Sequence, residues 1–285
     1  MQQQRGVLYV VATPIGNLAD MTERARTTLA VVDLVAAEDT RETLRLLAHW
    51  GLSATLVAYH DHNESRVAPT LLAALEAGRS VALVSDAGTP LINDPGYSLV
   101  AAAREQGFSV VPVPGANAAI CALSAAGLPS DRFLFLGFPP RTQSQRRAWL
   151  AAVAAEPGTL ILYESAKRAL ATLADLGAVL GETRRVVLAR ELTKRFETFL
   201  SGQPQALIER LKANPEQQLG ELVMLIEGRR CASDQLEIAE QERVLRILAE
   251  ALPLRQAVDL ASRVTGAKKN ALYRRGLDLG LGASD

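Results

Sequence analysis

The sequence predicts an α/β protein with two α/β domains, followed by a small all-helical module. Short β-branched runs alternate with helical patterns through the first half of the chain, and a second set of such runs follows. Beyond Gly228 the pattern is helical only. The length of 285 residues also exceeds what one hydrophobic core usually supports. We therefore expect three domains, at residues 1–115, 116–228 and 229–285.

The first domain is expected to contain five short strands, each followed by a helix. Asp20 with Glu23, and Asp39 with Glu42, have the spacing of capping boxes, which mark helix starts. Regular alternation of strands and helices predicts a mostly parallel sheet. The strands are expected at residues 7–12, 34–37, 55–58, 81–84 and 110–113.

The second domain is expected to contain a mixed sheet. Only a short connection separates the strand candidates that end at Arg190 and begin at Phe196, which predicts an antiparallel pair. The strands are expected at residues 133–136, 159–163, 186–190, 196–200 and 222–226.

The terminal module is expected to hold three helices, at residues 236–251, 254–264 and 267–279. The last two are joined at Thr265-Gly266 and resemble a helix-turn-helix. The 31 basic and 31 acidic residues of the chain cancel, so contact with a polyanion requires local clustering. The module has such a cluster, with Tyr273 inside it, and we interpret it as a nucleic-acid contact; a solvated helix face is the alternative. Its basic residues are Arg255, Arg263, Lys268, Lys269, Arg274 and Arg275.

The cysteines and the N-terminal segment indicate a cytoplasmic protein. Cys121 and Cys231 cannot form a disulfide framework, and the three histidines show no metal-binding spacing. We expect free thiols and no metal. The apolar stretch at residues 7–12 is too short for a signal peptide or a membrane span.

Polar loops follow all five strands of the first domain. In an open α/β sheet these loops meet at one crevice, where such sheets bind ligands. The sequence has neither a Gly-x-Gly-x-x-Gly start to its first helix nor a Walker loop, which disfavours a ligand with a pyrophosphate. The loops are residues 13–18, 38–41, 60–64, 85–90 and 114–117.

Motifs along residues 7–228 resemble the ribosomal RNA small-subunit methyltransferase I family, a branch of the tetrapyrrole methylase superfamily. Ala116 and Leu219 depart from the residues that the family commonly has there. The resemblance rests on residues 13–18, 36–41, 60–64, 85–96, 124–133, 163–165, 167–168, 189–194 and 220–221.

The resemblance implies two α/β domains of the tetrapyrrole methylase type, usually in a homodimer, with S-adenosylmethionine in the cleft between the domains. It also implies methylation of the ribose oxygen of a cytidine in the decoding region of 16S ribosomal RNA, met as naked RNA or in the small ribosomal subunit. The cofactor would be surrounded by Pro14, Asp86, Gly88, Thr89, Asn117, Ala118 and Tyr163.

A ribose hydroxyl is a poor nucleophile, so a base or a nearby cation would help the transfer. Arg168 is a candidate phosphate contact; a plain surface pair with Glu164, at i,i+4 spacing, is the alternative. Asp39 is equally suited to cap a helix, and His60 and His62 could be solvated in a turn. The sequence does not rank the candidate catalytic residues, which are Glu38, Asp39, Arg41, His60, His62, Glu191 and Lys194.

Two other functions stay open from the sequence. One is methylation of a tetrapyrrole carbon, which would not need the basic module. The other is a non-catalytic RNA-binding factor in ribosome assembly, which would bind RNA without binding a methyl donor.

Overall fold

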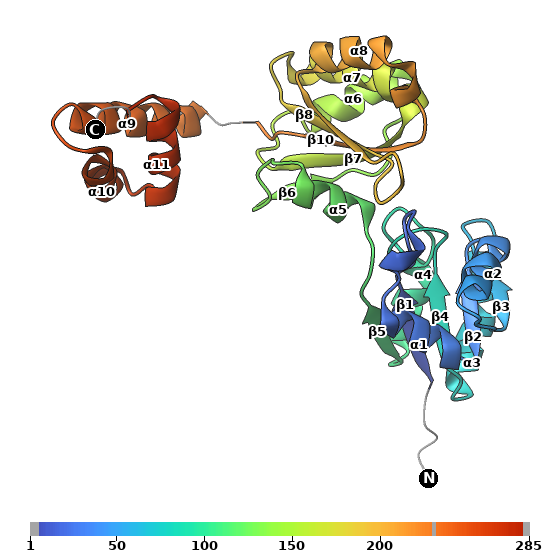
Figure 1. Cartoon of the computed structure of the whole chain (residues 1–285). Coiled ribbons are helices and arrows are strands. Elements are labelled where there is room, and N and C mark those ends of the chain that lie inside the picture. The colour runs from blue at the N-terminus through green and yellow to red at the C-terminus, as the bar shows by residue number, and fades with distance from the viewer. Residues whose placement is uncertain (1–5, 230–231, 282–285) are drawn as a thin grey trace. The chain divides into compact units, whose positions relative to one another are not determined.

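The computed structural model describes residues 6–229 and 232–281, so Cys231 lies outside the described residues. The chain divides into two compact units, Met1–Glu227 and Gly228–Asp285 (Figure 1). Within the described residues, the first unit contains two five-stranded sheets, and the second contains three helices. The predicted α/β class with a helical C-terminal module is confirmed.

The first sheet is parallel throughout, with strand order β3-β2-β4-β1-β5. Val81 and Leu83 of β4 pack on one face of the sheet with α3 and α4, whereas Ala82 and Val84 pack on the other face with α1 and α2. The predicted strands are all present. The elements are β1 (Val7–Val11), η1 (Leu18–Asp20), α1 (Glu23–Val31), β2 (Leu34–Ala37), α2 (Thr40–His49), β3 (Leu56–Ala58), α3 (Glu64–Glu76), β4 (Val81–Val84), α4 (Tyr97–Glu105) and β5 (Ser109–Val113).

The second sheet is mixed, with order β6-β7-β10-β8-β9. Only β6 and β7 are parallel, and β8 pairs with β9 in the predicted antiparallel sense. Leu150, Leu173 and Leu207 of α6, α7 and α8 belong to one core, while α5 packs on the other face. The elements are α5 (Ala118–Ala125), β6 (Phe133–Phe135), α6 (Gln143–Ala152), β7 (Thr159–Ser165), η2 (Ala166–Arg168), α7 (Ala169–Leu180), β8 (Val186–Arg190), β9 (Thr198–Gly202), α8 (Pro204–Ala213), η3 (Pro215–Gln218) and β10 (Glu221–Ile226).

Strand β9 begins two residues later than predicted, because the segment before it forms a tight loop. Glu191 and Thr193 have positive φ angles of 52° and 65°. The N–H of Thr193 donates to Oε2 of Glu197 at 2.6 Å and closes the loop.

A buried ion cluster joins α6 to α7. Asp175 has an exposed fraction of 0%, and Arg146 one of 4%. The guanidinium of Arg146 approaches Asp175 Oδ2 to 2.6 Å, and Nε of Arg147 donates to Oδ1 at 2.6 Å. Burial opposes the charge of Asp175, but these hydrogen bonds outweigh it and lower the pKa of Asp175.

In the part of the second unit that the structure describes, the three predicted helices are present as α9 (Ala232–Ala249), α10 (Leu254–Thr265) and α11 (Lys269–Asp278). Leu245, Val258 and Leu272 bring one side chain from each helix into a small core. Gly266 ends α10 in the left-handed conformation, with φ of 75°, so the chain turns directly into α11. Among the helices that the structure describes, none has the length and apolar character to cross a membrane.

Candidate active site

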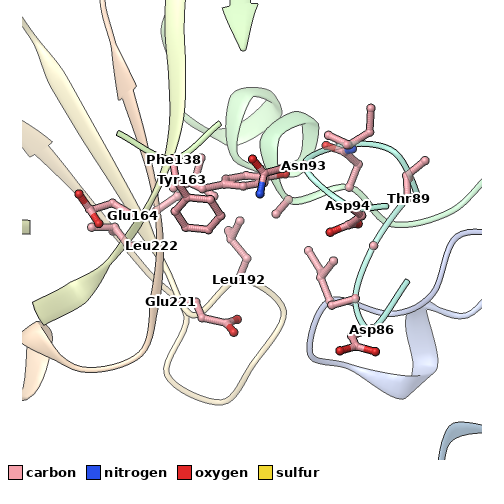
Figure 2. A pocket seen from close by; sticks show the side chains of 18 of the residues that line it. Asp86, Thr89, Asn93, Asp94, Phe138, Tyr163, Glu164, Leu192, Glu221 and Leu222 are labelled. Carbon is pink, nitrogen blue, oxygen red and sulfur yellow. The ribbon is translucent and has the colours of Figure 1, made fainter. Parts of the chain in front are cut away.

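A cavity of about 360 Å³ lies at the carboxyl ends of the first sheet's strands, and residues of the second sheet complete its wall. Figure 2 shows Phe138 and Tyr163 on one side, Asp86 and Asp94 on the other. This volume is typical of a small-molecule site. The wall consists of Ile15, Glu38, residues 86–89, 92–94, 117–118, Phe138, residues 163–165, Ala189, Leu192 and residues 220–223.

Four of the five predicted polar loops meet at this cavity. The loops after β1, β2, β4 and β5 supply Ile15, Glu38, Asp86 and Asn117 to its wall. Of the seven residues predicted around a cofactor, six line the cavity and Pro14 lines a neighbouring hollow. The topology therefore brings the predicted segments together.

The loop after β3 does not contribute to this wall. His60 is not among the residues that line the cavity, but it is within electrostatic reach of Glu38. The N–H of His60 donates to Oδ1 of Asn63 at 2.9 Å, which fixes the turn before α3. Within the described chain, Nδ1 of His60 is buried without a hydrogen-bond partner. His60 and His62 contact each other edge to face, at 6.0 Å between ring centroids.

Hydrogen bonds join the loops after β1, β4 and β5 into one backbone surface. The N–H of Thr13 donates to the Gly88 carbonyl at 2.8 Å, and the N–H of Gly88 donates back at 3.0 Å. The hydroxyl of Thr89 donates to the Ala116 carbonyl at 2.9 Å. Gly88 has φ of +89°, and a Cβ there would lie 3.3 Å from Ile15. A ligand can therefore approach the backbone at Gly88 closely.

Two carboxylates at the cavity rim are fixed by main-chain donors. Oε2 of Glu38 accepts from the Asp86 N–H at 3.2 Å, and Oδ1 of Asp86 accepts from the Asp39 N–H at 2.9 Å. Burial raises the pKa of Glu38 and also that of Asp86, and neighbouring acidic charges add to both shifts. The rim favours a ligand that carries positive charge.

The part of the wall contributed by the second sheet and its loops is aromatic and aliphatic. The rings of Tyr163 and Phe135 meet edge to face at 4.9 Å, and Phe138 lies 5.6 Å from Tyr163. Leu192 points toward the same space in Figure 2. Such a wall suits a flat ring, and the opposite carboxylates suit hydroxyl and ammonium groups. S-adenosylmethionine combines an adenine, a ribose, an ammonium and a sulfonium, so the residues present fit it.

Glu164 and Arg168 form the i,i+4 pair, but not on the surface. Glu164 is 2% exposed, accepts from the Thr172 hydroxyl at 2.7 Å and lies 3.3 Å from the Arg168 guanidinium. Arg168 also donates to the carbonyls of Pro139 and Pro140, each at 2.9 Å. The pair thus fixes the segment that carries Phe138.

A second hollow of about 340 Å³ shares Ile15, Asp86, Ala87 and Glu221 with the cavity. Lys194 lines it, and Nζ lies 2.9 Å from Glu221 Oε2 and 3.1 Å from Glu191 Oε1. Burial opposes the charge of Lys194, but hydrogen bonds to Glu221 and Glu191 outweigh it and raise the Lys194 pKa. Burial likewise opposes the charge of Glu191, yet the Glu221 N–H and Lys194 lower its pKa.

Asp39 is the N-cap of α2. Its Oδ1 accepts from the Arg41 N–H at 2.8 Å, and its Oδ2 lies 2.6 Å from the Arg41 guanidinium. Hydrogen bonds from Arg41 lower the pKa of Asp39 to about 2. A carboxyl with so low a pKa is a weak proton acceptor at neutral pH.

The basic cluster of the second unit contains two kinds of charge. Lys269 lies 2.5 Å from Asp259, and Arg275 bonds to Gln241 at 3.2 Å and lies 3.6 Å from Glu242. The other four, which are exposed and have no ion pair to any side chain that the structure describes, are Arg255, Arg263, Lys268 and Arg274.

The sequence reasoning did not single out Asp94 or Phe138. Asp94 follows Asn93 and precedes Pro95-Gly96, a turn-forming sequence inside the long segment after β4. The polar loop predicted at the sheet edge covered residues 85–90, so the available signal for Asp94 was the length of the segment beyond that loop. The sequence has no comparable signal for Phe138, because its position depends on the hydrogen bonds that the distant Arg168 donates to Pro139 and Pro140.

The chain matches known families over nearly its whole length. The family described as Tetrapyrrole (Corrin/Porphyrin) Methylases matches residues 7–208, and the domain described as RsmI C-terminal HTH domain matches residues 235–280. A protein of Escherichia coli O157:H7 named ribosomal RNA small subunit methyltransferase I is 54% identical, covering 96% of each chain. One of the same name from Pseudomonas aeruginosa is 50% identical, covering 95% of this chain and 97% of its own.

Solved structures with the same fold are more distant in sequence. Diphthine synthase superimposes with a TM-score of 0.60 at 14% identity, covering 81% of this chain and 94% of its own. Uroporphyrin-III C-methyl transferase from Thermus thermophilus, complexed with S-adenyl homocysteine, has a TM-score of 0.53 at 18% identity, covering 77% and 97%. These likenesses show the fold. The close relatives and the matching domains establish that the chain belongs to the ribosomal RNA small subunit methyltransferase I family of the tetrapyrrole methylases.

Proposed function

We propose that this chain is an S-adenosylmethionine-dependent methyltransferase that methylates the ribose 2′-hydroxyl of a cytidine in the decoding region of 16S ribosomal RNA. The observation that carries the proposal is the cavity at the sheet edge, with a backbone surface at Gly88, carboxylates at Glu38 and Asp86, and an aromatic wall at Tyr163. Close relatives named for ribosomal RNA methylation support the choice of substrate.

The residues of the cavity would hold and orient the methyl donor. When bound, S-adenosylmethionine supplies a methyl group activated by a sulfonium. The carboxylates of Asp86 and Glu38 would receive its hydroxyl or ammonium groups, while Tyr163 and Phe138 would cover its apolar surface and exclude water. Much of the rate gain in such a transfer comes from holding the two reactants in line.

The second hollow would receive the RNA. It shares Asp86 and Glu221 with the cavity, so a nucleotide held there would extend past these residues into the cavity, where its ribose would lie beside the bound methyl donor and Asp94. Lys194 would stabilise negative charge that develops on the ribose oxygen, because its raised pKa keeps the ammonium protonated at neutral pH.

The helical unit would add affinity for RNA. Lys268 and Arg274 lie in the same segment as Tyr273, a residue that is 37% exposed. Basic side chains with an exposed aromatic are typical of contacts to single-stranded RNA, where bases stack on the ring.

The test is a methylation assay with isotope-labelled S-adenosylmethionine and three acceptors: 16S ribosomal RNA, assembled small ribosomal subunits and a porphyrin precursor. We expect label in RNA, at the ribose of one cytidine. Label in the porphyrin would support the tetrapyrrole alternative instead. RNA binding with no calorimetric signal for S-adenosylmethionine would indicate an assembly factor.

We further propose that the protein is cytoplasmic, because its proposed substrate is ribosomal RNA. We also propose that it forms a homodimer. Ile120 of α5 is 49% exposed beside small side chains, which suits contact with a second copy. Sedimentation velocity would give a species of twice the 30.6 kDa chain mass if this holds, and a monomer otherwise.

A further inference from the structure

The turn that carries Asp94 has an unusual backbone. Leu91 and Asn93 have φ angles of +73° and +70°, in the left-handed region that non-glycine residues rarely adopt. Asp94 follows directly, and its carboxyl group reaches the cavity wall (Figure 2). Backbone conformations of this kind persist only where the surroundings impose them, and they gather at functional sites.

Positive φ angles at non-glycine residues occur at only two places in the described chain. One is the segment 91–93, and the other is 191–193, where Glu191 and Thr193 have φ of 52° and 65°. Both segments contribute to the wall of the cavity. The strain is therefore concentrated around this one site.

Close contacts hold the turn in place. A Cβ at Gly96, where φ is +127°, would lie 2.6 Å from the Leu83 side chain. A Cβ at Gly137 in the second domain would lie 2.8 Å from Oδ1 of Asn93. Glycine at both positions lets the turn pack tightly, so the Asp94 carboxyl group has a fixed place.

Asp94 is surrounded mainly by acids. Burial, with a smaller contribution from the charges of Glu38, Asp86 and Asp61, raises its pKa to about 6, although a hydrogen bond from Ser85 acts in the opposite direction. Tyr163, from β7, is the other titratable group that faces it. In the part of the chain that the structure describes, Asp94 takes part in no salt bridge.

Each of the other candidate carboxylates has a main-chain or cationic donor on at least one oxygen. Asp39 is bound to Arg41, Oε2 of Glu38 accepts from the Asp86 main chain, and Oδ1 of Asp86 accepts from the Asp39 main chain. Glu191 is bound to Lys194 and to the Glu221 main chain. Asp94 faces the cavity with only a hydroxyl as its partner.

We propose that Asp94 is the proton acceptor in the methyl transfer, an inference that rests on the function proposed above. The Asp94 carboxylate takes the proton of the ribose 2′-hydroxyl while the hydroxyl oxygen forms its bond to the methyl carbon. The electron pair of the breaking carbon–sulfur bond stays on sulfur, so a sulfonium and a carboxylate become a thioether and a carboxylic acid. Asp94 later releases the proton to water.

The test compares wild-type protein with Asp94→Asn, which keeps the shape and removes the basic oxygen. With small ribosomal subunits and saturating S-adenosylmethionine, we expect kcat to fall by about 100-fold or more. In the wild type, kcat/KM should fall tenfold per pH unit below about pH 6, and this dependence should vanish in Asp94→Asn. Asp131→Asn, an exposed residue away from the cavity, is the matched control.

Two measurements that need no turnover accompany the assay. Calorimetry should give a dissociation constant for S-adenosylmethionine within about threefold of wild type. Carbon-13 NMR of labelled aspartates should show one carboxyl that titrates near pH 6 and is missing from Asp94→Asn.

Unchanged kcat in Asp94→Asn, or a dissociation constant raised more than about tenfold with full kcat at saturation, overturns the proposal. The second result would make Asp94 a cofactor ligand. If the wild type itself transfers no methyl group to ribosomal RNA, the proposed function fails first, and the two failures are thus distinguishable.

Discussion

Asp175 and Asp94 are both withdrawn from water, yet the protein treats them in opposite ways. Asp175 is fully buried between α6 and α7, and Arg146 and Arg147 bind it directly. Asp94 faces a cavity beside other acids, and burial raises its pKa to about 6. A carboxylate that holds helices together is neutralised by the fold itself. A carboxylate that faces the cavity, such as Asp94, has no cation of the described chain beside it and stays available to a ligand. Its burial lowers the stability of the folded protein.

Asp175→Asn is expected to have the largest effect on stability, and it tests the structural half of this comparison. Removing the charge leaves Arg146 buried without its partner, and breaking a buried pair from one side costs about 3–5 kcal/mol. Urea unfolding monitored by circular dichroism would measure the loss. A loss below about 1 kcal/mol would mean that the cluster contributes little to the fold.

Asp94→Asn should change the free energy of unfolding in the opposite direction. The pKa of Asp94 is about 6 in the folded protein and near 3.8 in the unfolded chain, so the folded state binds the proton more tightly. The ionised Asp94 carboxylate therefore destabilises the folded state. This destabilisation is absent below about pH 4, grows as the pH rises to about 6, and is complete above about pH 6. After a discount for solvent screening of this half-buried group, we expect Asp94→Asn to stabilise the protein at pH 8 by on the order of 2 kcal/mol, and at pH 4 by less than about 0.5 kcal/mol. Equal effects at both pH values would remove ionisation as the cause.

Asp86→Ala should weaken S-adenosylmethionine binding by about tenfold, or 1.4 kcal/mol, which corresponds to one charge-assisted hydrogen bond. Calorimetric titration measures this, and truncation after Gly228 serves as the control that should leave the affinity intact. An unchanged dissociation constant in Asp86→Ala would remove Asp86 from the cofactor site.

The smallest effects are expected in the helical unit. Lys268→Gln with Arg274→Gln should weaken RNA binding a few-fold and make the slope of log K against log salt shallower by about 0.7 for each phosphate that the variant no longer neutralises. Lys269→Gln with Arg275→Gln is the matched control, because acidic neighbours already face those charges. If both pairs reduce the slope equally, the distinction between free and paired charges has no bearing on RNA binding.

The strands and the sheet edge could be predicted because they depend on local pattern. The run at residues 81–84 is short, apolar and bounded by polar residues, and it forms a strand buried on both faces. Parallel order then brings the loops after β1, β2, β4 and β5 together. Nothing beyond the period of apolar residues and the turn chemistry was needed.

The roles of single charged residues could not be predicted in the same way. The basic run at residues 268–275 does not reveal that Lys269 meets Asp259 while Lys268 stays exposed, because that depends on how α10 and α11 pack. Arg168 has the sequence setting of a surface cation, yet it holds two carbonyls 28 and 29 residues earlier in the chain. Such roles come from contacts between distant segments.

The most direct test of the proposed activity is a mass-spectrometric map of ribose methylation in small-subunit ribosomal RNA, from cells with and without the gene for this protein. We predict that one cytidine of the decoding region carries a 2′-O-methyl group only when the protein is present. Identical maps from the two strains would contradict the proposed activity.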